Sequence, residues 1–473
     1  MSGTTAYDDV AYPATLFPAT HPDHLAAIAI LHGLDPPDIT RARVLEIAGG
    51  DGVGQIALAA AYPEAQFDSF DLSREAVARG VRLADAAGLT NVRIEHGDLL
   101  DRAETMAAPY DYVIAHGLYA WVPDAVRAAT MRLIGRVLSD RGVAFISYNA
   151  LPGGHLRRAV RDMLLHHVEG ITDPVARVRA AHDCLLAFSR PHEGDRPVLQ
   201  AMRDVARPML SKNLGTLFHD ELGESYAPQS LSDVVAAAAG HGLRFLNDAG
   251  STMVRDGLPG VLPGGATDDA AVVRAAQVSD YESVAFFHQS LFVRAGSAPA
   301  RQLDPSVFAR LYGASRVQRT GATHFRLGED PFEVADSQLC DLLEAMATAW
   351  PARVPLARIA DSPDRAEALV TLYRSEVLTL HSTPVPARMI PGARPCASPV
   401  ARAQIALGGT TLFTLDHRVV AFEAPGPRAF VALLDGSRDR AELAAAWAGT
   451  PYGSEVDVDT ALAQIARVPL LVA

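Results

Sequence analysis

One segment near the start of the chain reads Val44-Leu45-Glu46-Ile47-Ala48-Gly49-Gly50-Asp51-Gly52-Val53-Gly54. It joins an apolar run that contains one acid to a glycine-rich turn and then to a helical pattern. Glycines in such a turn tolerate positive φ angles and let the backbone approach a ligand closely. The segment therefore predicts a buried strand, a ligand-binding turn and the start of a helix.

The residues after this segment continue the alternation. Helices are expected at Val53–Ala61, Ser73–Ala87 and Asp124–Leu138, between strands at Arg43–Ile47, Ala65–Phe70, Val92–Glu95, Tyr110–Ala115 and Gly142–Ser147. Strands that alternate with helices indicate βαβ units and a parallel sheet. After a long helical stretch, a helix at Ser230–Gly242 and strands at Leu243–Leu246 and Phe287–Val293 complete the sheet. We therefore expect an α/β protein with a Rossmann-like, seven-stranded, mostly parallel sheet.

The order of these segments predicts four regions. Residues 1–155 form the first part of the core, 156–212 a helical cap, 213–297 the part that completes the sheet, and 301–473 a C-terminal region. Small residues and prolines make Ser297–Pro305 a plausible linker. Short helices beside small strands in the last region suggest one or two winged-helix-like α+β units. Its expected elements are strands at Thr323–Leu327, Val377–Leu380 and Val419–Phe422 and helices at Asp336–Ala349, Leu356–Ile359, Asp364–Ser375, Arg428–Leu434, Arg440–Ala448 and Val458–Arg467.

Charge and composition narrow the class of protein. The chain has 473 residues, with 42 Lys and Arg against 55 Asp and Glu, and a net charge of −13. This balance opposes binding to a phosphate backbone, so no nucleic-acid partner is expected. The apolar runs fall far short of the ~20 residues of a membrane span, and the first ten residues lack the basic region of a secretory signal. We expect a cytoplasmic protein without membrane insertion, and the sequence does not indicate its oligomeric state.

Neither disulfides nor a metal site are expected. The cysteines Cys184, Cys340 and Cys396 show no paired spacing, and the 16 histidines show no HxxxH pattern accompanied by its acid. These are the spacings on which a disulfide framework or a zinc site depends.

Two acids follow the next two strands. A nucleotide-binding turn needs an acid at the end of the second strand, about 20 residues on, to bind ribose hydroxyls. Asp71 stands there, followed by Leu72, and Asp98 ends the third strand, where it could accept from an adenine amino group. The alternative is an ordinary tight turn with surface acids.

Several further blocks carry a resemblance to a known family. These blocks are Tyr7–Pro13, Thr20–Asp23, Asp111–Pro123, Ser147–His155, Phe218–Leu222 and Leu433–Arg440. With the glycine turn and Asp71, they resemble class I S-adenosylmethionine-dependent methyltransferases, and more narrowly the bacterial family in which that domain is joined to a methyltransferase regulatory domain. The best-known members are protein lysine methyltransferases that act on outer-membrane proteins. The resemblance implies S-adenosylmethionine as cofactor and N-methylation of lysine side chains on a surface or outer-membrane protein.

The chain departs from the family at two positions. Ala48-Gly49 stands where the family usually has Gly-Cys, which places a methyl group where the backbone approaches the cofactor. Gly154 stands where the family often has Trp, which removes an aromatic wall from the substrate side. Two other functions therefore stay open: methylation of a small molecule or natural product, and a non-catalytic, cofactor-binding scaffold.

The resemblance and the strand ends together predict a cofactor site. Pro22 suits the first position of a helix with Thr20 as its N-cap, and that helix end could receive the carboxylate of the cofactor. Simple capping is the alternative for His21. The residues expected around the cofactor are Glu46, Ala48, Gly50, Gly52, Asp71, Leu72, Asp98, His116 and His21.

The acceptor side is predicted from residues that follow the fourth and fifth strands. Tyr119 and Trp121 could surround a cationic amine, or could belong to a packing loop. Asn149 could accept from the amine, or could form an ordinary turn. The catalytic candidates are Tyr148, Asn149, His219, Asp220 and His116, and the substrate-binding candidates are Tyr119, Trp121, Glu221 and Glu224.

Three further features bear on the acceptor side. A carboxylate beside His219 can raise its basicity, so that it takes a proton or holds a lysine, whereas a solvated helix start is the alternative. Lys212 is the only lysine, which suits an enzyme that methylates lysines but also follows from arginine-rich codon usage. Arg157 and Arg158 are read as structural or solvent-facing. We expect an acidic and aromatic mouth for the substrate.

Overall fold

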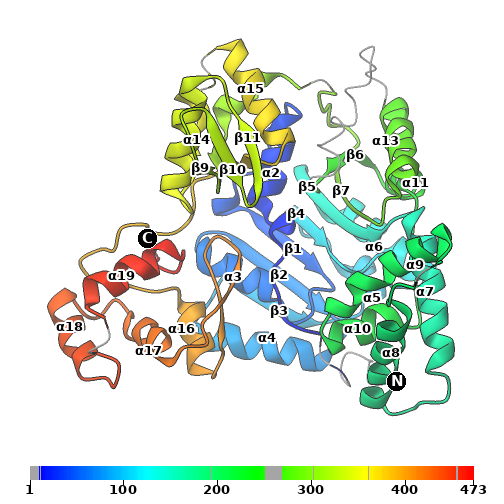
Figure 1. The fold of residues 1–473 in the computed structure, drawn as a ribbon, viewed down its shortest axis with the longest axis horizontal. Helices are drawn as coiled ribbons and strands as arrows, with labels where there is room; N and C mark the ends of the chain where they lie inside the picture. The colour runs from blue at the N-terminus through cyan, green and yellow to red at the C-terminus, as the bar shows by residue number, and fades with distance from the viewer. Residues whose placement is uncertain are drawn as a thin grey trace.

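The computed structural model describes residues 10, 12–192, 194–250, 269–301, 303–358, 360, 362–453 and 456–472. The expected opening block at 7–13 lies outside these residues except for positions 10, 12 and 13. A seven-stranded sheet with the order β3-β2-β1-β4-β5-β7-β6 occupies the centre (Figure 1). Its strands are β1 Arg43–Ile47, β2 Gln66–Asp71, β3 Val92–His96, β4 Tyr110–Ala115, β5 Leu138–Asn149, β6 Leu243–Asp248 and β7 Phe287–Arg294.

The sheet is mostly parallel, which confirms the predicted fold class. Strands β3, β2, β1, β4 and β5 pair in parallel, whereas β7 runs antiparallel to both β5 and β6. All five parallel strands therefore end at one edge. Ligands of open α/β sheets bind beyond such a carboxyl edge.

Helices cover both faces of the sheet because alternate strand residues are apolar on both sides. Val44 and Phe67 pack with the helices α2 and α3. Leu45 and Phe70 share a core with α5, α6 and α11 on the other face. The bounds are α2 Pro22–Leu31, α3 Val53–Ala61, α4 Arg74–Ala86, α5 Leu99–Thr105, α6 Asp124–Val137 and α11 Leu231–Ala239.

A group of helices, called the cap, follows β5 and extends past residue 212, where the sequence predicts that it ends. It begins at Gly153, three residues before its expected start, and Val160, Leu164, Leu185 and Leu217 form its core. Its helices are α7 Gly153–His167, α8 Pro174–Phe188, α9 Pro197–Ala206, the 3-10 helix η3 Arg207–Ser211, and α10 Leu214–Leu222. The sequence also predicts a helical segment at Gly264–Tyr281, between the last two strands. Residues 264–268 lie outside the described residues, and helix α13 (Asp269–Ser283) covers the rest and precedes β7.

The first C-terminal unit consists of two three-stranded sheets with helices. Its core contains Phe308, Phe325 and Leu343 and also Ile30 and Leu31 of α2. Helix α2 therefore belongs to two cores. The elements are η4 Pro305–Arg310, β8 Tyr312–Ala314, β9 Gln318–Arg319, β10 His324–Leu327, β11 Asp330–Glu333, α14 Ser337–Ala349, β12 Val354–Pro355, η5 Leu356–Arg358, α15 Pro363–Arg374 and β13 Thr379–His381.

The second C-terminal unit contains a two-stranded sheet and four helices. Val400 and Phe413 pack against Val53 and Ile56 of α3 and Val77 of α4, so this unit rests on the core (Figure 1). The winged-helix character of the two units stays a prediction. The elements are α16 Pro399–Ala406, β14 Thr411–Phe413, β15 Val419–Ala421, α17 Pro425–Leu433, α18 Arg440–Ala448 and α19 Val458–Arg467.

The carboxylate of Asp23 connects the first C-terminal unit to the core through hydrogen bonds and an ion pair. Asp23 in α2 is 1% exposed and accepts from His381 Nδ1 at 2.7 Å and from the backbone N–H groups of Ser382 and Thr383 at 2.7 and 2.9 Å. Arg353 Nη1 lies 2.9 Å from the same carboxylate. Burial opposes ionisation, but Arg353 and His381 outweigh it and hold the pKa of Asp23 well below its usual value. The two parts of the chain are therefore joined through a buried, charged contact.

Candidate functional site

The glycine turn lies between β1 and α3 at the carboxyl edge of the sheet. Gly50 and Gly52 have φ angles of +59° and +66°. A Cβ at Gly49 would lie 2.3 Å from Ser69 Oγ, and one at Gly52 would lie 2.8 Å from Ile94 Cδ1. No atom lies within 4 Å of a Cβ built at Gly50, so the turn is packed beneath and open above. This shape fits a cradle for a ligand.

Asp71, the last residue of β2, faces the glycine turn. Its Oδ2 accepts from the Gly50 N–H at 2.9 Å, and its Oδ1 accepts from the Ser73 N–H at 2.8 Å. Because each carboxylate oxygen can accept more than one hydrogen bond, Asp71 keeps the capacity to bind two hydroxyls. The predicted pair of turn and acid is thus brought together in space.

Glu46 lies beneath the turn and not above it. Gln55 Nε2 donates to Glu46 Oε2 at 3.2 Å, and the same oxygen lies 3.4 Å from a Cβ built at Gly54. Burial raises the pKa of Glu46 to about 7, and the carboxylates of Asp51 and Asp71 add to the shift. These contacts make Glu46 a support of the turn, and its contact with a cofactor stays a prediction.

Ala48 adopts a conformation that favours glycine. Its φ angle is +55°, a region that costs an L-residue about 1–2 kcal/mol. Alanine in place of the family's usual glycine at position 48 therefore strains the backbone, besides placing a methyl group near the ligand.

Replacing Ala48 with glycine is expected to raise the free energy of unfolding by about 0.5–1 kcal/mol, because relief of this strain exceeds the entropy that glycine adds to the unfolded chain. Denaturant unfolding followed by circular dichroism measures the change. Ala57→Gly within α3 is the matched control and should destabilise by about 1 kcal/mol. Equal destabilisation by both substitutions would show that the backbone at Ala48 is not strained.

His116 follows β4 and lies at the same edge. Its Nδ1 is 2.9 Å from Ser147 Oγ, and the ring of Phe17 lies 4.0 Å away between centroids. Burial lowers the pKa of His116 to about 4, so the ring is neutral at pH 7. Phe17, which is 38% exposed, was missed by the sequence analysis because nothing local links it to this edge.

Leu72 and Asp98 border the acid of β2. Leu72 is 51% exposed, which is unusual for a large apolar side chain next to a binding turn. Asp98 caps α5 by accepting from the Leu100 N–H at 2.8 Å. Both positions suit the edge of a nucleoside site, and their contact with a cofactor stays a prediction.

The contacts of His21 are those of a helix-capping residue. It is the N-cap of α2, because its Nδ1 accepts from the Asp23 N–H at 3.0 Å. The expected N-cap, Thr20, instead donates to the Phe17 carbonyl within the preceding 3-10 turn η1 (Pro18–Thr20). The His21 ring is buried beside Tyr62 and His417. This is the capping alternative, and these contacts give no support to a role in cofactor binding.

The end of β5 carries the two residues expected on the acceptor side. Tyr148 is 1% exposed, and its hydroxyl lies 2.9 Å from Ser290 Oγ. Burial raises its pKa well above the usual value. Asn149 is 4% exposed, and its Oδ1 has no hydrogen-bond partner among the described residues. A buried acceptor without a partner is costly, so this oxygen is poised to receive a donor from a ligand.

Two aromatic residues follow β4 near this position. Tyr119 is buried and lies 6.2 Å from the Tyr148 ring, whereas Trp121 packs against Tyr226 at 5.2 Å. Arg157 and Arg161 of the cap stack over Trp121. The ring face of Trp121, which was expected to contact a cationic amine of the substrate, is therefore in contact with two arginines of the protein itself.

The acids of α10 are neutralised inside the protein. Glu221 has no exposed side-chain surface and lies 2.6 Å from Arg157 Nη2 and 2.8 Å from Lys212 Nζ. Asp220 lies 2.6 Å from Lys212 Nζ. Glu224 is exposed. Asp220 and Glu221 are therefore paired with basic residues of the protein itself, and the expected acidic mouth stays a prediction.

His219 is a weaker base than expected, because burial outweighs the effect of its acidic neighbour. Its Nε2 lies 2.6 Å from the Val10 carbonyl oxygen, and its ring packs on Tyr12 and Phe218. Burial lowers the pKa of His219 more than Val10 and Asp220 raise it. This direction is opposite to the one expected, and the catalytic role of His219 stays a prediction.

The described residues offer no sign of a metal centre or a membrane span. Among them, no group of three or more His, Cys, Asp or Glu is placed to hold a metal ion. Within the same ranges, each helix is too short or too polar to cross a bilayer.

Comparisons with known proteins identify the domain that carries this turn. Residues 44–142 match the methyltransferase domain family. The uncharacterized protein RP028 of Rickettsia prowazekii is 31% identical over 220 residues, which cover 46% of this chain and 88% of RP028. The uncharacterized protein RP789 of the same organism is 32% identical over 265 residues, 54% of this chain. The chain spans about half of the length of RP789, at 48%.

A solved structure shares the fold over almost the whole chain. PKMT2 from Rickettsia typhi superposes with a TM-score of 0.81 at 20% identity, covering 98% of this chain and 100% of PKMT2. A second structure of PKMT2, in complex with AdoHcy, gives a TM-score of 0.80. At this identity the likeness establishes the fold, and the domain match establishes the chemistry. The chain therefore belongs to the same family as RP028 and is a class I S-adenosylmethionine-dependent methyltransferase.

Proposed function

We propose that this methyltransferase methylates the side-chain amine of lysine residues on a protein substrate. The name PKMT2 denotes a protein lysine methyltransferase, and that protein has the same fold over the full length of the chain. The local motifs that follow β4 and β5 point to the same family. The finer assignment of a surface or outer-membrane substrate belongs to this proposal as well.

The chain's own residues fit the cofactor at the carboxyl edge. When bound, S-adenosylmethionine supplies a methyl group on a positively charged sulfur. Asp71 would accept from the ribose hydroxyls, and Gly50, with no atom within 4 Å of a Cβ built on it, would leave room for the backbone of the turn to approach the cofactor. Leu72, next to Asp71 in the sequence, and Phe17, which packs on His116, offer exposed apolar surface. A neutral His116 adds no charge that would repel a cationic sulfur.

The observation that carries the proposal is the unpartnered oxygen of Asn149. A neutral amine presents N–H donors, and one of them would satisfy Oδ1 while its lone pair points toward the reacting methyl group. Burial of the amine at this position would lower its pKa and favour the neutral, nucleophilic form. The neighbouring Tyr148 hydroxyl is held by Ser290 and orients the end of β5.

Labelled cofactor tests the proposal directly. The full-length enzyme is incubated with labelled S-adenosylmethionine and a surface-protein extract, with and without prior reductive blocking of lysines. Label in protein that disappears after blocking is the expected result. Label that persists in full would assign another nucleophile, and label found only in small molecules would assign a metabolite substrate. Absence of any turnover would favour a scaffold.

Replacing Asn149 with alanine should lower kcat/KM for the protein substrate about three- to tenfold, the effect of one lost hydrogen bond, with cofactor affinity unchanged. Steady-state kinetics and calorimetry measure the two quantities. Asn247→Ala is the matched control, because Asn247 in β6 also has a buried Oδ1 without a partner among the described residues. Equal losses in both variants would contradict a contact between Asn149 and the amine.

A further inference from the structure

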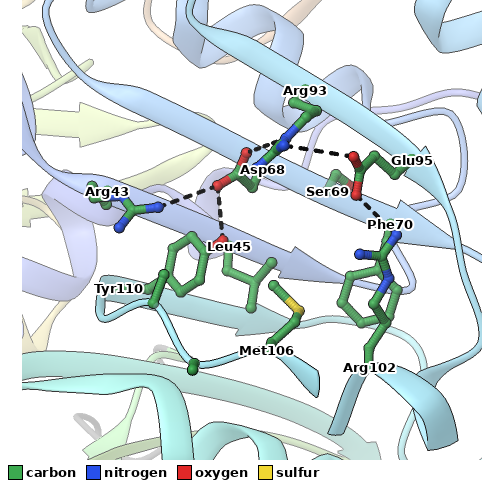
Figure 2. A pocket seen from close by; sticks show the side chains of 12 residues that line it. Arg43, Leu45, Asp68, Ser69, Phe70, Arg93, Glu95, Arg102, Met106 and Tyr110 are labelled. Carbon is green, nitrogen blue, oxygen red and sulfur yellow. Dashed lines mark hydrogen bonds and ion pairs between the residues drawn. The ribbon is translucent and has the colours of Figure 1, made fainter. Parts of the chain in front are cut away.

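A second site candidate lies on the α5 side of the sheet, over β1, β2 and β3. Figure 2 shows the side chains that line a cavity there. Its volume is about 270 Å³. The cavity is separate from the turn and acid described above, because its strand residues face away from α3. The lining residues are Arg43, Leu45, Asp68, Ser69, Phe70, Arg93, Glu95, Arg102, Met106, Ala107, Ala108 and Tyr110.

The cavity exists because α5 is short. This helix has seven residues and ends at Thr105, so the chain returns to β4 as a loop over Met106–Ala108. The strand face beyond the helix therefore lacks a helical cover. Leu45 and Phe70, both fully or nearly buried, form an apolar floor, and Met106 packs against the same core.

Charged side chains line the rim of this apolar floor. Arg43, Arg93 and Arg102 face the carboxylates of Asp68 and Glu95, which leaves one positive charge in excess (Figure 2). A ligand that enters this space therefore meets more donors than acceptors on charged groups.

The rim ion pairs leave many of the arginine donors available. Arg102 Nη2 lies 2.8 Å from Glu95, a close contact. Arg93 lies 3.4 Å from Asp68 and 3.6 Å from Glu95, and Arg43 lies 3.8 Å from Asp68. Each guanidinium has five N–H donors, and the long pairs made by Arg93 and Arg43, whose side chains are 66% and 39% exposed, are worth little. An incoming anion can therefore replace them at small cost and bind in a bidentate manner.

We propose that this cavity binds a small organic anion, a carboxylate or phosphate carried on a compact apolar body. Arg93 and Arg102 would bind the anionic group. Met106, Ala107 and Ala108, which keep accessible surface above the buried Leu45 and Phe70, would contact the apolar body. The volume is near the lower limit for small-molecule pockets, so a single ring or a short acyl chain fits.

The full-length protein is titrated with four probes by ligand-observed NMR and calorimetry. Benzoate and phenyl phosphate carry the proposed chemistry, benzamide lacks the charge, and inorganic phosphate lacks the apolar body. Benzoate, phenyl phosphate or both should bind at least tenfold more tightly than benzamide and inorganic phosphate. Tighter binding of benzoate than of phenyl phosphate identifies the anion as a carboxylate, and the reverse order identifies it as a phosphate. Failure of both to bind, or equal binding of benzamide or inorganic phosphate, would overturn the proposal.

Three variants locate the binding. Arg93→Gln changes a side chain that is 66% exposed, and Ala107→Asp places a competing carboxylate at an exposed position of the lining while all three arginines remain. Each should weaken probe binding at least tenfold with an unchanged circular dichroism spectrum. Arg82→Gln on α4 removes an exposed arginine outside the cavity and should leave binding unchanged. Full binding in both cavity variants would place the probes elsewhere and reject the site.

Discussion

Replacing Asp23 with alanine is expected to lower the free energy of unfolding by about 3–5 kcal/mol, the largest stability effect that the structure indicates. The substitution leaves Arg353, whose side chain is 5% exposed, as a buried charge without its partner. It also removes the acceptor for the N–H groups of Ser382 and Thr383. Denaturant unfolding followed by circular dichroism measures the loss.

Two further variants test the cause of this loss. Asp38→Ala removes an exposed cap of the 3-10 helix η2 (Ile39–Arg41) and should cost only about 1 kcal/mol. The double variant Asp23→Ala/Arg353→Met should recover part of the loss, because it removes the uncompensated charge. A loss no larger than that of Asp38→Ala would show that water replaces the carboxylate without penalty.

The same contact gives a pH dependence with a definite sign. The pKa of Asp23 is held well below its usual value in the folded protein. Its contribution to stability is therefore complete above the pKa of the unfolded chain and is lost as the pH falls toward the lowered folded-state value. The Asp23→Ala variant should lack this part of the acid dependence.

Replacing Asp71 with alanine should weaken the binding of S-adenosylmethionine about 10- to 100-fold, equivalent to about 1.5–3 kcal/mol. The carboxylate offers charge-assisted hydrogen bonds to two hydroxyls, and alanine offers none. Calorimetry measures the affinity, and circular dichroism verifies the fold.

Glu75→Gln provides the control for this variant, because Glu75 is an exposed acid in the first turn of α4. It should leave the affinity unchanged. An Asp71→Ala protein that stays folded and binds the cofactor as tightly as the parent would refute the assignment of Asp71 to the ribose.

The sheet could be predicted from the sequence because most of its strands are rich in apolar residues and are bounded by turns. Strands β1 and β4 have the predicted bounds, since burial on both faces makes their residues mostly apolar, apart from Arg43, Glu46 and Asp111. Helix α5 was not predicted. It has only seven residues, and its two buried side chains, Leu99 and Ala103, are too few to display a helical period.

The site could be predicted only where it depends on strand ends. The turn and Asp71 follow from the rule that ligands bind at the carboxyl edge. The pairing of Glu221 with Arg157 could not be predicted, because it depends on how α7 packs against α10. The stacking of Arg157 and Arg161 on the Trp121 ring could not be predicted for the same reason. Sequence spacing identifies which residues have useful chemistry, whereas tertiary packing decides which of them remain available to a ligand.

The strand order also bears on how a newly made chain assembles. β5 ends at Asn149, but its neighbour β7 begins only at Phe287. At synthesis rates of about 5–20 residues per second, this edge of β5 waits on the order of ten seconds for its partner. Open strand edges are templates for aggregation. Closure of the sheet by β7 is therefore a late step of synthesis, and the edge of β5 is open to misassembly until then.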